Sequence, residues 1–121
     1  MDSNKKYKWH KIADYQNELN FGTNNLLQLD VAGKTVCIAK GRDNLYACAY
    51  KCPHAGGIIA DGFIDALNNV VCPLHRYKYS LQNGRNVSGE GYYLKTYPMQ
   101  QTEKGIFIGI EEGGLLSFFS P

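Results

Sequence analysis

Cys52-Pro53-His54-Ala55-Gly56-Gly57 and Val71-Cys72-Pro73-Leu74-His75 are the two stretches of this sequence that decide its fold. Each stretch supplies one Cys and one His, two residues apart in the first and three residues apart in the second. A thiolate and an imidazole this close on one loop can bind the same inorganic centre, since both are common metal ligands. Together the two stretches offer four candidate ligands: Cys52, His54, Cys72 and His75.

Two kinds of metal centre use two Cys and two His. In a mixed-ligand [2Fe-2S] cluster, two Cys bind one iron and two His bind the other. A structural zinc ion is the main alternative, but zinc fingers take both Cys from one turn and both His from a helix about 12 residues away. Here each stretch mixes the two ligand types, which favours a centre with two unlike ends. We therefore predict one [2Fe-2S] cluster per chain, with zinc or no metal as the alternatives.

The two stretches resemble the ligand loops of the Rieske-type ferredoxin family, which contains one-electron carriers and partner subunits of oxygenases. The resemblance covers residues 45–97, and Leu94-Lys95-Thr96-Tyr97-Pro98 is similar to the stretch that follows the cluster region in many members. It implies an all-β fold, an antiparallel β-sandwich or barrel with a small cluster-binding subdomain inserted at about residues 50–88. The whole chain, residues 1–121, is then a single domain.

The pattern of short apolar runs and turn residues also predicts antiparallel strands. Ala32-Gly33 is expected to form a tight turn, and Asn83-Gly84 is the strongest turn signal in the chain. No segment has a helical period beyond one turn. The expected strands are Leu26–Val31, Lys34–Lys40, Leu45–Ala49, 63–67, 70–71, 76–80, 97–102 and 106–110.

Composition limits the choice of partners and of cellular compartment. Thirteen basic and eleven acidic residues leave a net charge of +2, which gives no nucleic-acid signature. The first ten residues are polar and basic without the apolar core of a secretory signal, and no run approaches the ~18 apolar residues of a membrane helix. We therefore expect a soluble, cytoplasmic protein, in which thiols stay reduced.

Several further residues invite a specific expectation. Cys37 and Cys48 lie in apolar runs, where a Cys is usually a small buried hydrophobic residue. High-potential Rieske proteins carry a disulfide between their ligand loops, but Gly57 and Leu74 occupy those positions here. His10 is expected on the surface or at a strand edge. The apolar segment 115–119 is expected to pack back on the sandwich or to contact a partner.

The resemblance also frames how the cluster would be tuned. High-potential members have a Ser and a Tyr that donate to sulfur where this chain has Tyr77 and Tyr79, so only Tyr79 is retained as a possible donor. Arg76 replaces a common Gly, and Ser88-Gly89-Glu90-Gly91 replaces a third loop that often contains Pro, which suggests a more flexible loop. With His ligands the cluster is neutral when oxidised, and the expected window is about −150 to +300 mV. Basic residues flank the ligands and offer a contact for an acidic partner: Lys51, Arg76 and Lys78.

These observations favour an electron-transfer protein over a stand-alone catalyst. The chain has no flavin or nucleotide fingerprint and no mononuclear iron motif, so we assign no catalytic residue. The favoured function is one-electron transfer between a reductase and an oxygenase or similar enzyme. Two alternatives stay open: a small subunit of a larger oxidoreductase such as nitrite reductase, and an interaction module stabilised by zinc or a cluster.

Overall fold

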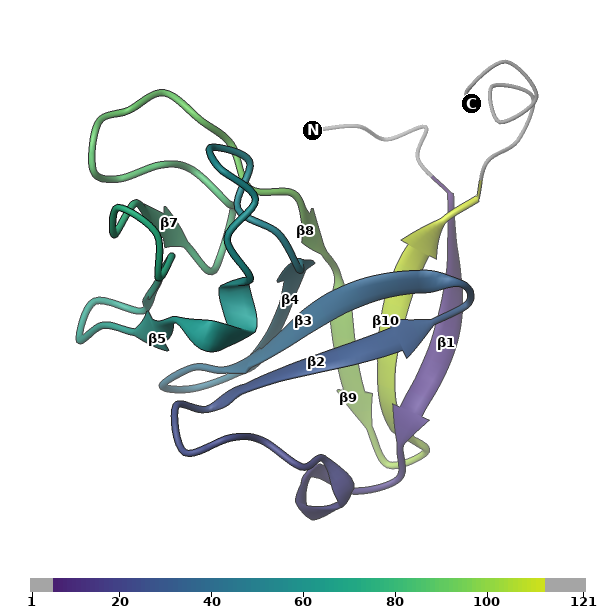
Figure 1. Ribbon diagram of the computed structural model, residues 1–121. Helices are drawn as coiled ribbons and strands as arrows, with labels where there is room; N and C mark the ends of the chain where they lie inside the picture. Colours follow the sequence, from purple (N-terminus) through teal and green to yellow (C-terminus); the bar gives the residue numbers. More distant parts are fainter. Residues whose placement is uncertain (1–5, 113–121) are drawn as a thin grey trace.

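The computed structural model describes residues 6–112, which form three antiparallel β-sheets and two short 3-10 helices (Figure 1). The all-β prediction is confirmed. The first half of the described chain contains β1 (Tyr7–Ala13), η1 (Gln16–Glu18), β2 (Leu26–Val31), β3 (Lys34–Lys40), β4 (Leu45–Ala49) and η2 (Ile59–Asp61). The second half contains β5 (Phe63–Ile64), β6 (Asn69–Val71), β7 (Lys78–Ser80), β8 (Thr96–Tyr97), β9 (Met99–Thr102) and β10 (Gly105–Glu111).

Two of the sheets pack face to face and form the body of the molecule. One has the strand order β2-β3-β4-β8 and the other has the order β1-β10-β9. Between them lies an apolar core to which both sheets contribute; its fully or mostly buried members are Val31, Val36, Ile38, Ala47, Tyr97, Ile108 and Ile110. Alternation along each strand sends every second side chain into this layer.

Strand β3 is buried on both faces, which makes it the centre of the structure. Val36 and Ile38 face the core between the two large sheets. Cys37 and Ala39 point the other way, into a second core shared with the small sheet. All four side chains have an exposed fraction of 0%. A strand covered on both sides needs a continuous apolar run, and the run from Val36 to Ala39 provides it.

The small sheet, with the order β5-β6-β7, stands at one end of the body and carries the connections that contain the four candidate ligands (Figure 1). Side-chain hydrogen bonds fasten it to the body at two points. Asn24, just before β2, donates to the carbonyl oxygens of Ala60 and Gly62 at 2.8 and 2.9 Å. Arg42, in the β3–β4 turn, donates to the carbonyl oxygen of Ala66 at 3.0 Å. These bonds fix the small sheet against the strands that precede it.

The first predicted hairpin is confirmed with the expected bounds. Strands β2 and β3 pair from Leu26 opposite Ala39 to Val31 opposite Lys34. Ala32 and Gly33 form the two-residue turn, with φ angles of 51° and 77°. Positive φ at both positions is what a two-residue turn needs to match the twist of its strands.

The predicted strand 97–102 is wrong as one element, because Pro98 divides it. Tyr97 belongs to β8 and pairs with Ala47 of β4, whereas Met99 begins β9 and pairs with Ile108 of β10. Proline has no N–H to donate to a ladder, so the chain leaves one sheet at this residue and enters the other. The passage from Tyr97 to Met99 therefore connects the two large sheets along one side of the sandwich.

The predicted strand 63–67 is too long, since β5 contains only Phe63 and Ile64. Asp65 ends it: its carboxylate accepts hydrogen bonds from the backbone N–H groups of Leu67 and Asn69 at 2.9 and 3.0 Å. A carboxylate that bonds to the backbone two residues on stabilises a turn instead of a strand. The turn therefore occupies residues 65–68, and Asn69 begins β6.

The predicted strand Leu45–Ala49 is confirmed with the expected bounds, as β4. The other strand predictions differ at their ends, and one strand was missed. The expected strand 76–80 begins only at Lys78, and the strand expected over 106–110 extends to Gly105–Glu111. No prediction covered β1, whose polar sequence has only half-buried or exposed side chains over most of its length. His10 lies on β1, at the edge of its sheet and half-buried, as expected. The apolar segment 115–119 lies outside the described residues.

The prediction that Cys37 and Cys48 are buried is confirmed. Their exposed fractions are 0% and 1%, and they face each other across β3 and β4. Both pack in the core that also contains Cys52 and Cys72. The sandwich and the two ligand-bearing loops therefore share one apolar interior.

Gly84 offers a test of how tightly the turn after β7 is packed. A Cβ at this position would lie 1.8 Å from the carbonyl oxygen of Leu94, and φ is +76°. Gly33 has nearly the same φ, +77°, but open space around the same position. We expect Gly33→Ala to lower the free energy of unfolding by about 1 kcal/mol and Gly84→Ala by at least about 3 kcal/mol. Urea denaturation measures both; equal losses would contradict the packing described here.

Candidate metal centre

The first ligand-bearing loop is a closed turn between β4 and η2. The N–H of Cys52 donates to the carbonyl oxygen of Gly57 at 2.8 Å, and the N–H of Gly56 donates to the carbonyl oxygen of Cys52 at 3.0 Å. Gly56 has a φ of +72°, which a glycine adopts without strain. These bonds hold the chain in a tight curve with the Cys52 side chain inside it and His54 at its tip.

The second loop, between β6 and β7, uses an unusual backbone conformation. The N–H of Cys72 donates to the carbonyl oxygen of Tyr77 at 2.9 Å, so the loop closes across its base. His75 and Arg76 both have positive φ angles, 61° and 58°. Arg76 therefore adopts the left-handed conformation for which glycine is usually preferred, at a cost of roughly 1–2 kcal/mol. The reversal turns the His75 imidazole back toward the first loop.

The four predicted ligands come together in two pairs. The thiols of Cys52 and Cys72, with exposed fractions of 2% and 0%, form the inner pair and lie in one apolar core. The imidazoles of His54 and His75 form the outer pair, with their Nδ1 atoms 3.4 Å apart. His54 is half-buried and His75 is exposed. Sulfur therefore faces the core and nitrogen faces the surface.

This layered arrangement fits a two-iron cluster better than a single ion. Within residues 6–112, no group of three or more His, Cys, Asp or Glu side chains is arranged to hold one metal ion. Two thiols and two imidazoles stand as separate ends of one site, which matches a cluster with unlike irons. The zinc alternative is correspondingly disfavoured, because tetrahedral zinc needs all four ligands around one point.

Gly57 lies close to the Cys72 sulfur and has no side chain that would crowd it. A Cβ at this residue would lie 2.8 Å from the Cys72 Sγ and 3.0 Å from the Leu74 Cγ. In this chain, a side chain at residue 57 would crowd the Cys72 sulfur unless the loop moved. The family resemblance puts one Cys of a disulfide at this position in high-potential proteins; here a glycine leaves the room free.

The surroundings of the two thiols shift their pKa values in opposite directions. Burial opposes ionisation of Cys52, but hydrogen bonds from Tyr79 and from the backbone N–H groups of His54 and Ala55 lower the pKa of this thiol. Burial, together with the nearby Cys52, raises the pKa of Cys72 to about 11. Backbone N–H groups aimed at a sulfur stabilise its thiolate, which is the form that binds iron.

Tyr79 lies in hydrogen-bond contact with Cys52, at the place where the sequence indicated a side-chain donor. Its hydroxyl oxygen lies 3.3 Å from the Cys52 Sγ, and its side chain is fully buried. Burial, followed by the contact with Cys52, raises the pKa of Tyr79, so the phenol keeps its proton. A metal-bound thiolate has no proton, and Tyr79 would then donate to it.

Aromatic rings cover one of the two imidazoles, which sequence analysis missed. Tyr77 stacks on His54 with ring centroids 4.1 Å apart and an interplanar angle of 22°. Tyr92 lies 5.2 Å from the same imidazole. The sequence places Tyr77 next to the second ligand loop. It does not show that the Tyr77 ring stacks on His54, because no local rule determines toward which imidazole the ring points.

The third loop, residues 88–91, is held by side-chain hydrogen bonds and not only by glycine. Asn86 donates to the Glu90 carboxylate at 3.0 Å and accepts from the N–H of Gly91 at 3.2 Å. Gly89 and Gly91 have φ angles of 92° and 85°. The sequence suggested a flexible loop because glycine replaces proline; it did not reveal that Asn86 bridges the loop internally.

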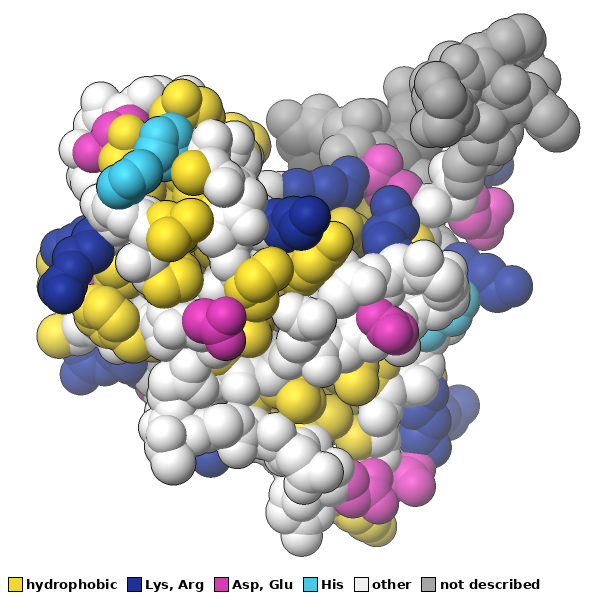
Figure 2. All heavy atoms as spheres, in the orientation of Figure 1, with side chains coloured by type: hydrophobic (Ala, Val, Ile, Leu, Met, Phe, Trp, Pro, Cys, Tyr) yellow, Lys and Arg dark blue, Asp and Glu magenta, His cyan; other side chains and the backbone are white. Residues whose placement is uncertain are grey.

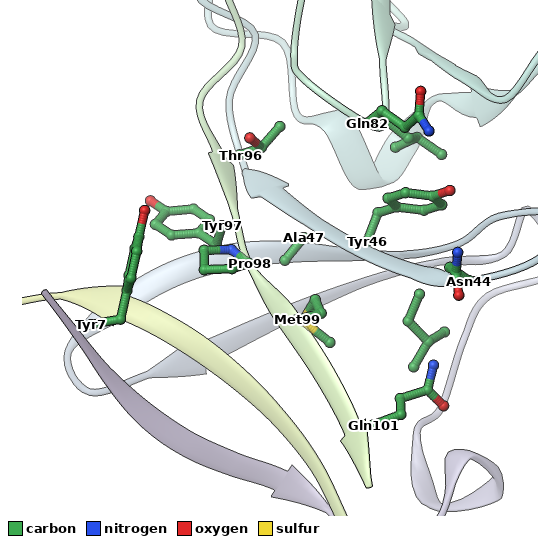
Figure 3. A pocket seen from close by; sticks show the side chains of 12 residues that line it. Tyr7, Asn44, Tyr46, Ala47, Gln82, Thr96, Tyr97, Pro98, Met99 and Gln101 are labelled. Atoms are coloured by element: carbon green, nitrogen blue, oxygen red, sulfur yellow. The ribbon is translucent and has the colours of Figure 1, made fainter. Parts of the chain in front are cut away.

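A groove lies away from the predicted ligands, between β4, β8 and β9 (Figure 3). Its volume is about 660 Å³, and tyrosine and amide side chains such as Tyr46, Tyr97 and Gln101 line it. Among the described residues, none of the four predicted ligands and no charged residue lines this groove. Histidine side chains are visible instead at the far end of the molecule, above the small sheet and beside hydrophobic side chains (Figure 2).

Comparison with known proteins agrees with this geometry. The model of the Rieske [2Fe-2S] domain matches residues 8–98, which is most of the chain and includes all four predicted ligands. The chain belongs to the Rieske [2Fe-2S] domain family. The predicted cofactor, one [2Fe-2S] cluster per chain, is therefore confirmed at the level of the family. Which residues bind it is not decided by that match and stays a prediction.

Individual Rieske relatives include parts of larger proteins and small subunits. A cholesterol 7-desaturase of Bombyx mori is 28% identical over 83% of this chain, and the match spans 23% of that protein. The ferredoxin subunit of a 3-phenylpropionate/cinnamic acid dioxygenase of Photorhabdus laumondii is 29% identical over 55% of this chain and 65% of that protein. The match thus covers less than two thirds of either curated relative.

Solved structures of two other proteins share the fold. The ferredoxin of carbazole 1,9a-dioxygenase from Nocardioides aromaticivorans IC177 aligns with a TM-score of 0.68 and 19% identity, over 88% of this chain and 97% of that chain. The terminal oxygenase of the same system aligns with a TM-score of 0.68 and 24% identity, over 83% of this chain and 29% of that one. The predicted sandwich with an additional small sheet is therefore the fold of both a free ferredoxin and part of an oxygenase.

The contact between Tyr79 and Cys52 predicts a change in reduction potential. A donated hydrogen bond stabilises the reduced, more negative cluster, and a net difference of ~1 kcal/mol corresponds to about 40 mV for one electron. We expect Tyr79→Phe to lower the potential by about this amount, measured by spectroscopic redox titration. Tyr97→Phe, a change at another buried tyrosine outside the ligand core, is the control and should leave the potential unmoved. An unchanged potential in Tyr79→Phe would show that Tyr79 only packs.

Proposed function

We propose that this protein is a Rieske-type ferredoxin that carries single electrons from a reductase to an oxygenase or similar enzyme. Its cluster would accept and release one electron at the surface where His54 and His75 lie. The observation that carries the proposal is the orientation of the site: buried thiols on the inside, and two imidazoles 3.4 Å apart on the outside. An electron carrier needs one end of its cofactor held firmly and the other within reach of a partner.

In this proposal Cys52 and Cys72 bind the inner iron, and His54 and His75 bind the outer iron through Nδ1. The convergence of the two Nδ1 atoms supports that choice of nitrogen. The other predicted feature of the ligands, a thiolate at Cys52, agrees with the lowered pKa of that residue. The protein's contribution is to preform the four positions before the cofactor is bound.

The surface around the imidazoles supports docking of an acidic partner. Lys51, Arg76 and Lys78 are exposed beside the ligand loops. Between residues 6 and 112, none of these three cations has a carboxylate within ion-pair distance. Unpaired positive charge attracts a negatively charged protein over roughly the Debye length, about 10 Å at 0.1 M salt.

A second candidate function is favoured by the match to the desaturase of Bombyx mori. That match uses most of this chain but under a quarter of the relative. We propose as the alternative that the chain acts as the electron-delivering part of a larger oxygenase-type assembly. The two functions use the same cluster and differ in the acceptor, which is a separate protein in one case and a permanently associated one in the other.

Electron paramagnetic resonance of the dithionite-reduced protein tests the cluster and its ligands. We expect a [2Fe-2S] signal with a lower average g value than that of an all-Cys cluster, and two irons and two sulfides per chain. Cys52→Ala, Cys72→Ala, His54→Ala and His75→Ala should each abolish the signal. Cys48→Ala and His10→Ala are matched controls that should keep it, since these residues lie outside the two loops. Stoichiometric zinc without iron would end the proposal.

Reaction with a small anionic oxidant tests the charged surface without a natural partner. We expect ferricyanide to oxidise the reduced protein more slowly as salt is added, because ions screen Lys51, Arg76 and Lys78. The double variant Arg76→Gln and Lys78→Gln should react several-fold more slowly at low salt and show a weaker dependence on salt. Lys34→Gln, at the β2–β3 turn, is the control and should behave as the original protein. Identical stopped-flow rates for both variants would exclude steering by this surface.

A further inference from the structure

The two imidazoles have different surroundings, although the sequence presents them as equivalent. His54 lies against two tyrosine rings: Tyr77 is stacked on it at 4.1 Å, and Tyr92 is tilted toward it at 5.2 Å. The two tyrosines are also close to each other, with centroids 5.8 Å apart. These rings form an aromatic cover, defined here as Tyr77 and Tyr92, and the only imidazole stacked on it among the described residues is that of His54.

His75 lies outside this cover. Its ring centroid is 6.3 Å from that of Tyr77, at an angle of 49°, and no ring contact joins it to Tyr92 within the described residues. Its side chain is exposed, whereas that of His54 is half-buried. The His54 imidazole is thus stacked on a ring face, whereas the exposed His75 imidazole makes only tilted ring contacts, with His54 at 5.0 Å and with Tyr77 at 6.3 Å.

The position of Tyr92 is set by the third loop. Asn86 joins that loop to β7: it donates to the carbonyl oxygen of Lys78 at 3.2 Å and accepts from the N–H of Gly91 at 3.2 Å. Ser88 accepts a hydrogen bond from the N–H of Lys78 at 3.0 Å. These bonds tie the loop to β7, which leads back to Tyr77. The segments next to Tyr77 and Tyr92 are therefore joined to each other by hydrogen bonds.

We propose that Tyr77 and Tyr92 are positioning residues that hold the His54 imidazole in its iron-binding orientation and keep water from its face. His54 becomes the firmly retained imidazole ligand, and His75 the readily exchanging one. This inference rests on the proposed function, because it assigns a role toward the cluster. It goes beyond that function by distinguishing two ligands that the motif alone treats alike.

The physical basis is the freedom that a detached imidazole has. A histidine that leaves its iron can rotate about two side-chain torsions into water, and it must be recovered before the cluster is lost. A ring stacked on its face removes most of those rotamers, so the imidazole stays within reach of the iron and rebinds. An imidazole in solvent has no such restraint.

Release of iron to bathophenanthroline disulfonate from the dithionite-reduced holoprotein measures this effect. We expect Tyr77→Leu, which keeps apolar bulk but removes the ring, to release iron about threefold to tenfold faster than the original protein. Tyr92→Leu should accelerate release by a smaller factor, and it decides the matter if Tyr77→Leu does not fold. Tyr77→Phe keeps the stacked ring and should restore the original rate.

Tyr93→Leu is the matched control. Tyr93 is next to Tyr92 and 64% exposed, and it makes no ring contact with either imidazole in the described part of the chain. Release at the original rate is expected for this variant. If it accelerates release as much as Tyr77→Leu, the effect is general loosening and the inference is wrong.

Pulsed electron paramagnetic resonance of the same samples adds a readout that simple destabilisation would not mimic. In Tyr77→Leu we expect the nitrogen coupling of one imidazole to broaden while that of the other is kept. Equal changes in both couplings, or original couplings and release rates in Tyr77→Leu and Tyr92→Leu alike, would overturn the inference. Absence of any cluster from the unmodified protein would instead overturn the proposed function, so the two failures are distinguishable.

Discussion

Burial of β3 on both faces is the constraint on which the rest of the structure depends. One face of the strand closes the core between the two large sheets, and the other face, with Cys37 and Ala39, closes the core beneath the ligand loops. Because the two cores share one strand and its neighbour β4, the loops rest on a surface that cannot shift without disturbing the sandwich. Close-packed interiors transmit such displacements and resist them.

The shared interior explains how short loops hold the four predicted ligands in place without a disulfide between them. The sulfur of Cys72 lies in a layer that includes Val70, Tyr79 and Leu94, each almost or completely buried. Backbone hydrogen bonds close both loops at their bases, and side chains from the body, Asn24 and Arg42, fasten the small sheet from outside. A covalent bridge between loops is one way to fix this geometry; packing and hydrogen bonds are the means used here.

Local chemistry made part of this structure predictable. The Ala32-Gly33 turn, the run from Val36 to Ala39 and the two ligand stretches each carry their own signal, since turn type, burial on both faces and metal affinity depend on nearby residues. Pro98 also carried a signal, but only the pairing of Tyr97 and Met99 with different strands shows that it marks a change of sheet. Strand β1 had no apolar pattern to detect, because it is an edge strand with one side in water. The stacking of Tyr77 on His54 depends on how two loops meet, and no local rule determines that.

The site has two different ends, because the thiols are buried in the core and the imidazoles lie at the surface. A protein that collides with the sandwich does not reach the thiols directly, because both are buried in the interior. A protein that collides with the surface around His54 and His75 can contact the imidazoles directly. Under the proposed function, productive encounters would therefore be limited to one small region of the surface, and the rate of electron exchange would depend on how often a collision is correctly oriented as much as on the driving force.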